Sequence, residues 1–321
     1  MTGQAEISPF GQTRDGQQIQ RITLRKGNLT ASILTYGAIL QSVRLAGVAH
    51  DLTLGSDRLA DYEGALCYHG ALVAPVANRI AGATARLGDQ TLRFEANQED
   101  RHSLHSGSTG AHAHVWQVTE AAAEHCKMTL DLPDGLGGFP GHRRIMLHWA
   151  VLDPARLRLD IRAETDAPTF MNPCNHSYWN LDGRDTWAGH QLKIMADEVV
   201  EVDADCVPTG RLISLSGHAL DMRAGRSLSP GQPAMDHNWC LGRQTVPLRD
   251  VLWLMGQSGL TMTLATTQPG VQVYDGRGYG YAGLAIEPQF WPDAPSHPHF
   301  PQITLRPGET YAQTTEWRFS R

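Results

Sequence analysis

Apolar and polar residues alternate along most of this chain. In residues 157–164 every odd position is apolar and every even position is polar or charged, and the same two-residue period occurs in residues 128–132, 145–151 and 315–319. This period is typical of a strand with one buried and one exposed face. Turn signals such as Pro-Asp-Gly at residues 133–135 separate the runs. The pattern predicts an all-β fold, a large antiparallel β-sandwich with few short helices.

Helical periodicity is rare in the sequence. Residues 59–65 predict one helix of about two turns. Residues 119–124 are rich in Ala, which favours helix, but the alternating residues on both sides predict a hairpin limb instead. Because no linker, charge block or internal repeat divides the chain, we expect residues 1–321 to form a single domain.

The charge balance and the cysteines narrow the function classes. The chain carries 27 Lys and Arg against 33 Asp and Glu, a formal net charge of −6. Nucleic-acid binding needs clustered cations, so we expect no nucleic-acid partner. The absence of a long apolar run or a signal-peptide pattern predicts a cytoplasmic protein with no membrane partner. Five scattered cysteines, an odd number, predict reduced thiols.

Four segments place polar residues inside apolar tracts, as functional sites often do. In residues 76–82 the pair Asn78-Arg79 interrupts the tract. A buried Arg offers fixed donors to sugar hydroxyls or carboxylates, and the alternative is a structural ion pair. In the second segment, His102 and His105 have the spacing His-x-x-His. On a strand or loop that spacing does not aim both rings at one point, and no third ligand is near in sequence, so we expect no metal.

The third segment, residues 171–181, is the densest polar and aromatic cluster in the chain. Its His176 stands between Asn and Ser/Tyr neighbours, which can hold the ring in one tautomer, as a general acid or base requires. Tyr178 and Trp179 favour a sugar pocket over the alternative of a hydrogen-bonded core histidine. In the fourth segment, Glu287 interrupts an apolar strand before Pro288. Burial raises the pKa of a carboxyl group and makes it a better base near neutrality, and the alternative is an ion pair with an Arg.

Together and in this order, these segments resemble the aldose 1-epimerase (galactose mutarotase) family, over residues 10–319. The family's fold is a large antiparallel β-sandwich, the supersandwich, with a sugar cleft on its concave face. The resemblance is carried by Asn78-Arg79-Ile80, Leu104-His105, residues 175–181, Pro208-Thr209-Gly210, Asp236-His237-Asn238, Pro269-Gly270-Val271-Gln272, Glu287-Pro288-Gln289 and Arg306-Pro307-Gly308-Glu309.

The resemblance implies a reaction in which only protons move. A base takes the proton of the C1 hydroxyl, an acid protonates the ring oxygen, and the open aldehyde recloses on either face, so no metal and no organic cofactor is expected. It assigns the base to Glu287, the acid to His176, and sugar binding near the reacting centre to His105. The expected partner is a small sugar, and the expected assembly is a monomer or homodimer. The family's hydroxyl-binding positions correspond to Asn78, Arg79, Tyr178, Asp236 and Gln272.

Departures from the family pattern border the expected cleft. Many members have Gly-Arg where this chain has Ala74-Pro75, Gly where it has Ser106, and an aromatic residue where it has Met235. These differences affect the preferred sugar more than the reaction, because none removes a catalytic side chain.

Three other functions stay open. A glycosidase or lyase would use Asp236 and Glu287 as its carboxylate pair. A non-catalytic carbohydrate-binding module would keep the cleft alone. A sugar-phosphate 1-epimerase would need a basic cluster at the cleft. Arg79 is the only basic residue in the pocket motifs, and Arg143-Arg144 are expected to begin a strand at the surface, so we expect an unphosphorylated aldose.

Overall fold

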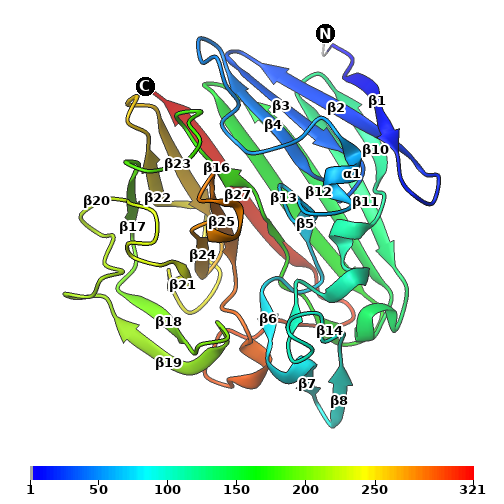
Figure 1. Ribbon diagram of the computed structural model, residues 1–321. Coiled ribbons are helices and arrows are strands. Elements are labelled where there is room, and N and C mark those ends of the chain that lie inside the picture. The colour runs from blue at the N-terminus through cyan, green and yellow to red at the C-terminus, as the bar shows by residue number, and fades with distance from the viewer. Residues whose placement is uncertain (1–2) are drawn as a thin grey trace.

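The computed structural model describes residues 3–321, and a nine-stranded sheet forms its framework (Figure 1). Its neighbouring strands run antiparallel, as the alternation predicts. In order across the sheet, the strands are β10 (Gln117–Ala122), β11 (His125–Leu132), β12 (Arg143–Leu152), β13 (Arg156–Thr165), β27 (Tyr311–Ser320), β23 (Thr261–Thr266), β22 (Arg249–Met255), β17 (Gln191–Ile194) and β20 (Arg226–Ser227).

Two further sheets cover the inner face of this framework. One is β1 (Glu6–Gln12), β2 (Gln18–Lys26), β3 (Leu29–Leu34) and β4 (Leu40–Leu45). The other is β16 (Tyr178–Trp179), β25 (Leu284–Gln289), β24 (Gly270–Tyr274), β21 (Asp236–Cys240), β18 (Glu198–Val202) and β19 (Pro208–Ser214).

Apolar side chains from all three sheets meet in one core. Trp317 of β27 lies with its ring centre 5.9 Å from that of Trp179 in β16 and 6.1 Å from that of Trp149 in β12. Along β13, Leu157, Leu159 and Ile161 are buried, while the charged residues that alternate with them are partly or fully exposed. The predicted antiparallel β-sandwich is therefore confirmed, with the two-residue period deciding which side chains enter the core.

Short elements join the sheets. The hairpin limb predicted at residues 119–124 is confirmed: these residues form the end of β10 and the turn into β11. The predicted two-turn helix is shorter than expected, because Gly64, a poor helix former, follows soon after its start. The remaining elements are α1 (Leu59–Tyr62), the two-stranded pairs β5 (Leu72–Val73) with β15 (Cys174–Asn175), β6 (Arg79–Ile80) with β9 (Ser103–Leu104), β7 (Thr84–Leu87) with β8 (Gln90–Arg93) and β14 (Thr169–Phe170) with β26 (Thr304–Leu305), and the 3₁₀ turns Ala81–Ala83, Gly107–Thr109, Ala111–Ala113, Leu136–Gly138, Arg277–Tyr279 and Ala294–Ser296.

The expectation that Arg143 lies at the surface is wrong. Its side chain is fully buried, and its guanidinium donates to the backbone carbonyls of Phe139, Gly141 and Leu136. Burial lowers its pKa to about 10. Arg143 occupies one of the alternate positions of β12 whose side chains point into the protein, like the apolar residues that follow it. The backbone carbonyls that accept its hydrogen bonds therefore replace water around its buried charge.

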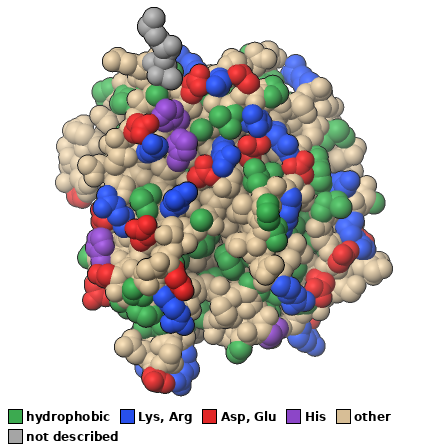
Figure 2. Space-filling model, turned by 180° about the vertical axis from the view of Figure 1, so that it is seen from behind, with side chains coloured by type: hydrophobic (Ala, Val, Ile, Leu, Met, Phe, Trp, Pro, Cys, Tyr) green, Lys and Arg blue, Asp and Glu red, His purple; other side chains and the backbone are tan. Residues whose placement is uncertain are grey.

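The outer surface mixes acidic and basic side chains with scattered apolar ones, as the view from behind shows (Figure 2). Large hydrophobic residues that are exposed stand apart in the chain, at Ile7, Met195 and Leu248. Within residues 3–321, no helix has the length and apolar character needed to cross a membrane. All five cysteines are free thiols.

Candidate active site

A cavity of about 450 Å³ brings together the segments that the sequence singles out. Seven of the eight predicted site residues line it, and the eighth, Gln272, donates a hydrogen bond to Asp236 in its wall. The lining residues are Tyr68, Asn78, Arg79, Leu104, His105, His176, Tyr178, Cys206, Asp236, Tyr274, Arg277, Gly278, Tyr279 and Glu287.

Glu287 lies in the middle of β25, where Gln272 of β24 is its cross-strand partner. Only 1% of its surface is exposed, and burial raises the pKa of its carboxyl group from 4.5 to about 8. Among the residues described, no Arg lies within ion-pair distance of this carboxylate; Arg79 pairs with Asp236 instead. The alternative of a structural ion pair with an Arg is therefore wrong, and the predicted rise in pKa is present.

His176 stands opposite this carboxylate. Its Nε2 is 3.5 Å from Oε1 of Glu287, and burial lowers the pKa of the imidazole to about 3. The expectation that neighbouring Asn and Ser residues hold the ring is wrong: Asn175 donates to the carbonyl of Gly70, and Ser177 donates to Oδ1 of Asn175. Those bonds fix the backbone on either side of His176. The ring itself packs between aromatic groups, with Tyr178 at 5.1 Å between ring centres.

Asn78 and His105 hold each other at the cavity wall. The backbone N–H of Asn78 donates to Nδ1 of His105 over 3.1 Å, and the N–H of His105 donates to the carbonyl of Asn78 over 2.9 Å. Both residues have left-handed backbone conformations, with φ of 60° and 53°, which non-glycine residues seldom adopt outside sites that need them. Because Nδ1 accepts a bond and burial keeps the pKa of His105 low, its Nε2 carries the proton and is a donor.

Asp236 is held through both carboxylate oxygens. Arg79 lies 3.3 Å from Oδ2, and Nε2 of Gln272 donates to Oδ1 over 2.7 Å. Arg79 is held in turn by Gln98, whose Oε1 accepts from its Nε over 2.8 Å. This chain of contacts joins β6, β21 and β24, and it presents a fixed array of donors and acceptors to a polar ligand.

The His-x-x-His pair does not converge, but a third potential ligand does approach His105. His102 accepts from the N–H of Gly82 and lies 3.6 Å from Asp205, away from the cavity. Ligand atoms of His105, His176 and Glu287 all lie within 4.8 Å of one another. No third ligand is near His105 in sequence, but the fold brings Glu287 to it from a strand 182 positions further along the chain.

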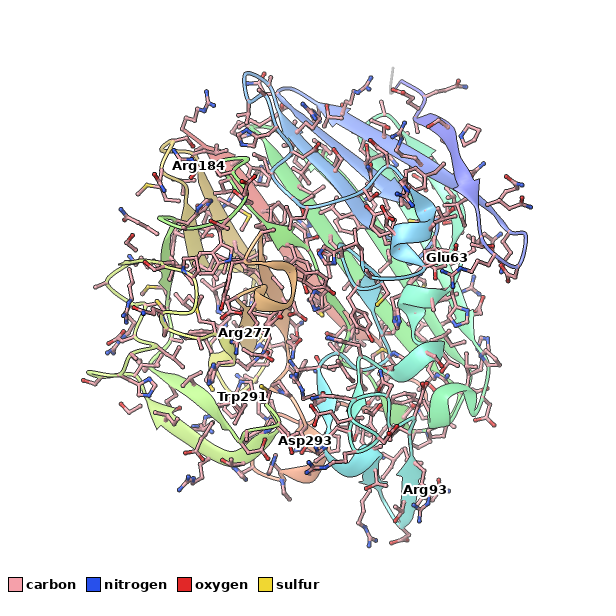
Figure 3. The ribbon with its side chains drawn as sticks, in the orientation of Figure 1. Glu63, Arg93, Arg184, Arg277, Trp291 and Asp293 are labelled. Carbon is pink, nitrogen blue, oxygen red and sulfur yellow. The ribbon has the colours of Figure 1, made fainter. Side chains whose placement is uncertain are left out.

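Sequence reasoning missed the aromatic wall of the cavity. Tyr68 packs 4.6 Å from the ring of His105, and Tyr279 packs 5.5 Å from that of Tyr178. It also missed Arg277, which follows β24 (Figure 3), so Arg79 is not the only basic residue in the pocket. The run Tyr-Asp-Gly-Arg-Gly-Tyr-Gly-Tyr at residues 274–281, rich in aromatic residues and glycine after a strand, was the available signal.

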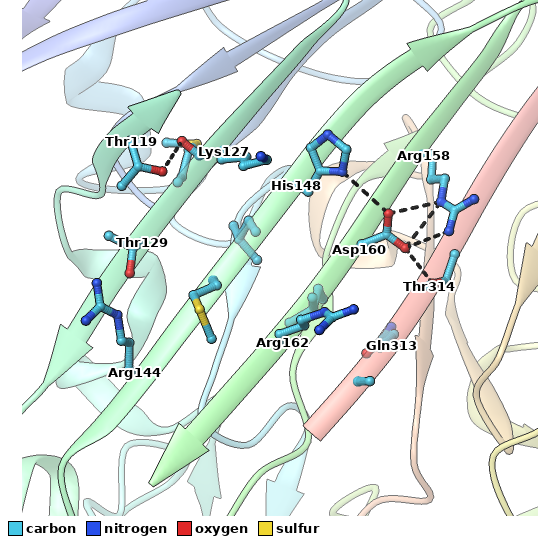
Figure 4. Close-up of a pocket in the computed structure, with 15 residues that line it drawn as sticks. Thr119, Lys127, Thr129, Arg144, His148, Arg158, Asp160, Arg162, Gln313 and Thr314 are labelled. Carbon is cyan, nitrogen blue, oxygen red and sulfur yellow. Dashed lines mark hydrogen bonds and ion pairs between the residues drawn. The ribbon is translucent and has the colours of Figure 1, made fainter. Parts of the chain in front are cut away.

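A second cavity, of about 540 Å³, lies on the outer face of the nine-stranded sheet over β11, β12, β13 and β27 (Figure 4). It contains none of the predicted site residues. Arg158 there pairs with Asp160, and Lys127 pairs with Glu120. This surface therefore lacks the buried titratable pair that distinguishes the first cavity.

The chain is similar in sequence to known proteins over nearly its whole length. A family model described as Aldose 1-epimerase matches residues 20–318. The galactose mutarotase of Bos taurus is 33% identical, with 94% of each chain covered, and the aldose 1-epimerase of Escherichia coli K12 is 30% identical, with 95% of this chain and 96% of that one covered.

Solved structures of similar proteins have the same fold. The aldose epimerase homologue from C. elegans is 30% identical with a TM-score of 0.88, over 94% of this chain and 98% of that one. The galactose 1-epimerase of Lactobacillus acidophilus, at 24% identity, shares the fold with a TM-score of 0.86 over 99% of each chain. The chain therefore belongs to the aldose 1-epimerase family, a family of isomerases.

Proposed function

We propose that the protein interconverts the α and β anomers of a free aldose, a hexose like galactose or glucose or a related pentose. The observation that carries this proposal is the buried pair of Glu287 and His176, with Oε1 and Nε2 3.5 Å apart in a cavity lined by hydroxyl-binding groups. Polarimetry of freshly dissolved α-anomers of several aldoses, with and without the protein, tests it and ranks the substrates.

In the proposed reaction, Glu287 takes the proton from the C1 hydroxyl while His176 gives a proton to the ring oxygen. The bond between C1 and the ring oxygen breaks, the aldehyde group rotates about the C1–C2 bond, and the reverse transfers close the ring. Nε2–H of His105 donates to the oxygen on C1 and polarises it. No atom is gained or lost, so the side chains supply only acid and base catalysis.

The protonation states of Glu287 and His176 before the sugar binds are compatible with these proton transfers. Burial favours a neutral carboxyl on Glu287 and a neutral imidazole on His176. The catalytic form, an ionised carboxylate facing a protonated imidazole, contains the same number of protons. One proton shift between the two groups, directly or through the bound sugar, produces it.

The pH dependence follows from these two groups. We expect kcat/KM to stay high between about pH 4 and pH 7 and to fall above about pH 8, because the pair then loses its last proton and none remains for the ring oxygen. Below about pH 3 the imidazole of His176 is protonated while Glu287 is still protonated. The two groups then hold two protons, no base remains for the C1 hydroxyl, and activity falls again. Initial rates in constant-ionic-strength buffers measure this profile. A rate that keeps rising through pH 9 is the contrary result.

The contacts of Asp236 support sugar binding over glycoside cleavage. Both of its oxygens are already engaged by Arg79 and Gln272, which suits an acceptor for a sugar hydroxyl and not a nucleophile. Asn78 and Tyr178 complete the proposed hydroxyl-binding set. The pair of proton-transfer groups argues against a non-catalytic binding module.

The balance of charge in the cavity favours an unphosphorylated sugar. Arg79 is neutralised by Asp236, and Nε of Arg277 lies 2.8 Å from Oδ1 of the fully buried Asp275. Neither guanidinium is left uncompensated for a phosphate dianion. We expect kcat/KM for galactose or glucose to exceed that for its 6-phosphate by roughly tenfold or more, the effect of about 1.4 kcal/mol. A preference for the phosphorylated sugar in parallel NMR rate measurements contradicts this prediction.

A further inference from the structure

Cys174 lies directly behind the buried carboxylate of Glu287. Its Sγ donates a hydrogen bond to Oε2 over 3.3 Å, while the other oxygen, Oε1, faces His176 at 3.5 Å. The two oxygens of Glu287 therefore have different partners. One is held from behind, and the other is directed toward the acid group and the cavity.

The surroundings of Cys174 leave its thiol one polar contact. The side chain is fully buried and packs with Val73 and Ala77 in a small apolar cluster. Within residues 3–321, Glu287 is the only side chain that its sulfur meets at hydrogen-bond distance. Burial and the nearby carboxyl group raise the pKa of the thiol well above 9, so the sulfur keeps its proton and acts as a donor.

We infer that Cys174 is a positioning residue for the catalytic base, an inference that rests on the proposed function. Its thiol hydrogen bond orients the carboxylate so that Oε1 reaches the C1 hydroxyl. A donor also bonds more strongly to an ionised carboxylate than to a neutral one, so it favours the form that accepts the proton. Consistent with this, the bond from Cys174 acts to lower the pKa of Glu287, against the larger effect of burial.

The test compares Cys174→Ala, which removes the donor, with Cys174→Ser, which keeps one. Cys126→Ala is the matched control, because Cys126 is equally buried but lies in β11 and is not among the residues that line the cavity. We expect Cys174→Ala to lower kcat at pH 7 roughly three- to tenfold with KM changed less than twofold, and to move the alkaline limb up by roughly half to one pH unit. Cys174→Ser should restore both values, and Cys126→Ala should match the wild type.

An alkaline limb of Cys174→Ala that coincides with the wild-type limb overturns the inference, whatever happens to kcat, because loss of packing alone leaves the ionisation of Glu287 unchanged. If Cys174→Ala does not fold, Cys174→Thr and Cys174→Val give the same comparison of donor against no donor.

A readout without turnover separates this inference from the proposed function. The infrared carboxyl band of Glu287, identified by its loss in Glu287→Gln, can be titrated in each variant. We expect its midpoint to rise in Cys174→Ala and to return in Cys174→Ser, even if no aldose tested is a substrate. An unshifted midpoint overturns the inference while leaving the proposed function intact.

Discussion

Replacing Glu287 by Gln is expected to lower kcat by about 10² to 10⁴ with little change in sugar affinity, because the amide keeps the shape of the side chain but cannot accept a proton. Glu287 is the only carboxylate that meets His176 in the described part of the cavity. NMR rates at saturating sugar, with binding measured separately by calorimetry, check both parts. A variant that keeps most of its kcat contradicts the assignment of the base.

The same substitution should stabilise the fold. The pKa of Glu287 is raised in the folded protein, so its contribution to stability is fully present below about pH 4.5 and is lost as pH rises through about 8. Near pH 7 this ionisation lowers the free energy of unfolding by on the order of 3 kcal/mol. A Gln amide does not ionise, so it does not lower the stability in this way. We expect the free energy of unfolding of Glu287→Gln to exceed that of the wild type by a margin that grows between pH 5 and pH 8. Urea unfolding at both pH values shows whether it does, and a margin independent of pH is the contrary outcome.

Removing the acid should lower kcat by a factor similar to that for removing the base. We expect His176→Ala to lower kcat by about 10² to 10⁴, because the ring oxygen loses its proton source. His105→Ala should both lower kcat and raise KM, since Nε2–H of His105 meets the sugar in the ground state and the transition state alike. Steady-state kinetics separate the two patterns.

The control for these histidine variants is His148→Ala. His148 lies half-buried on the outer face of the nine-stranded sheet, beside Asp160, and we expect no change in kinetics. If the kcat of His176→Ala is no lower than that of the wild type or of His148→Ala, His176 is not the acid of the reaction.

Local sequence pattern accounts for most of the fold. The alternation in residues 145–151 and 157–164 correctly predicted β12 and β13 and the side chains that each buries. Arg143 differs from the prediction because it occupies the same alternate positions of β12 as Ile145 and Leu147, whose side chains are buried. The alternation of side chains along the strand decides which residues are buried here, because backbone carbonyls lie close enough to accept hydrogen bonds from the Arg143 guanidinium.

The candidate site was less accessible to local pattern. A carboxylate in an apolar strand marked Glu287, and its raised pKa was foreseeable from burial alone. Pairing across the fold was not foreseeable: Arg79 meets Asp236 at a separation of 157 positions, and Cys174 meets Glu287 at a separation of 113. Such contacts depend on sheet order and register, which no short segment specifies.

Exchange NMR on the anomeric protons of galactose at equilibrium tests the central claim most directly, with the protein first dialysed against a chelator. We expect magnetisation to pass between the α and β signals at a rate that increases in proportion to the protein concentration, and the same concentration of Glu287→Gln to leave the rate at that of buffer alone. An exchange rate that the wild-type protein does not raise, for galactose and for every other free aldose tried, would contradict the proposed function.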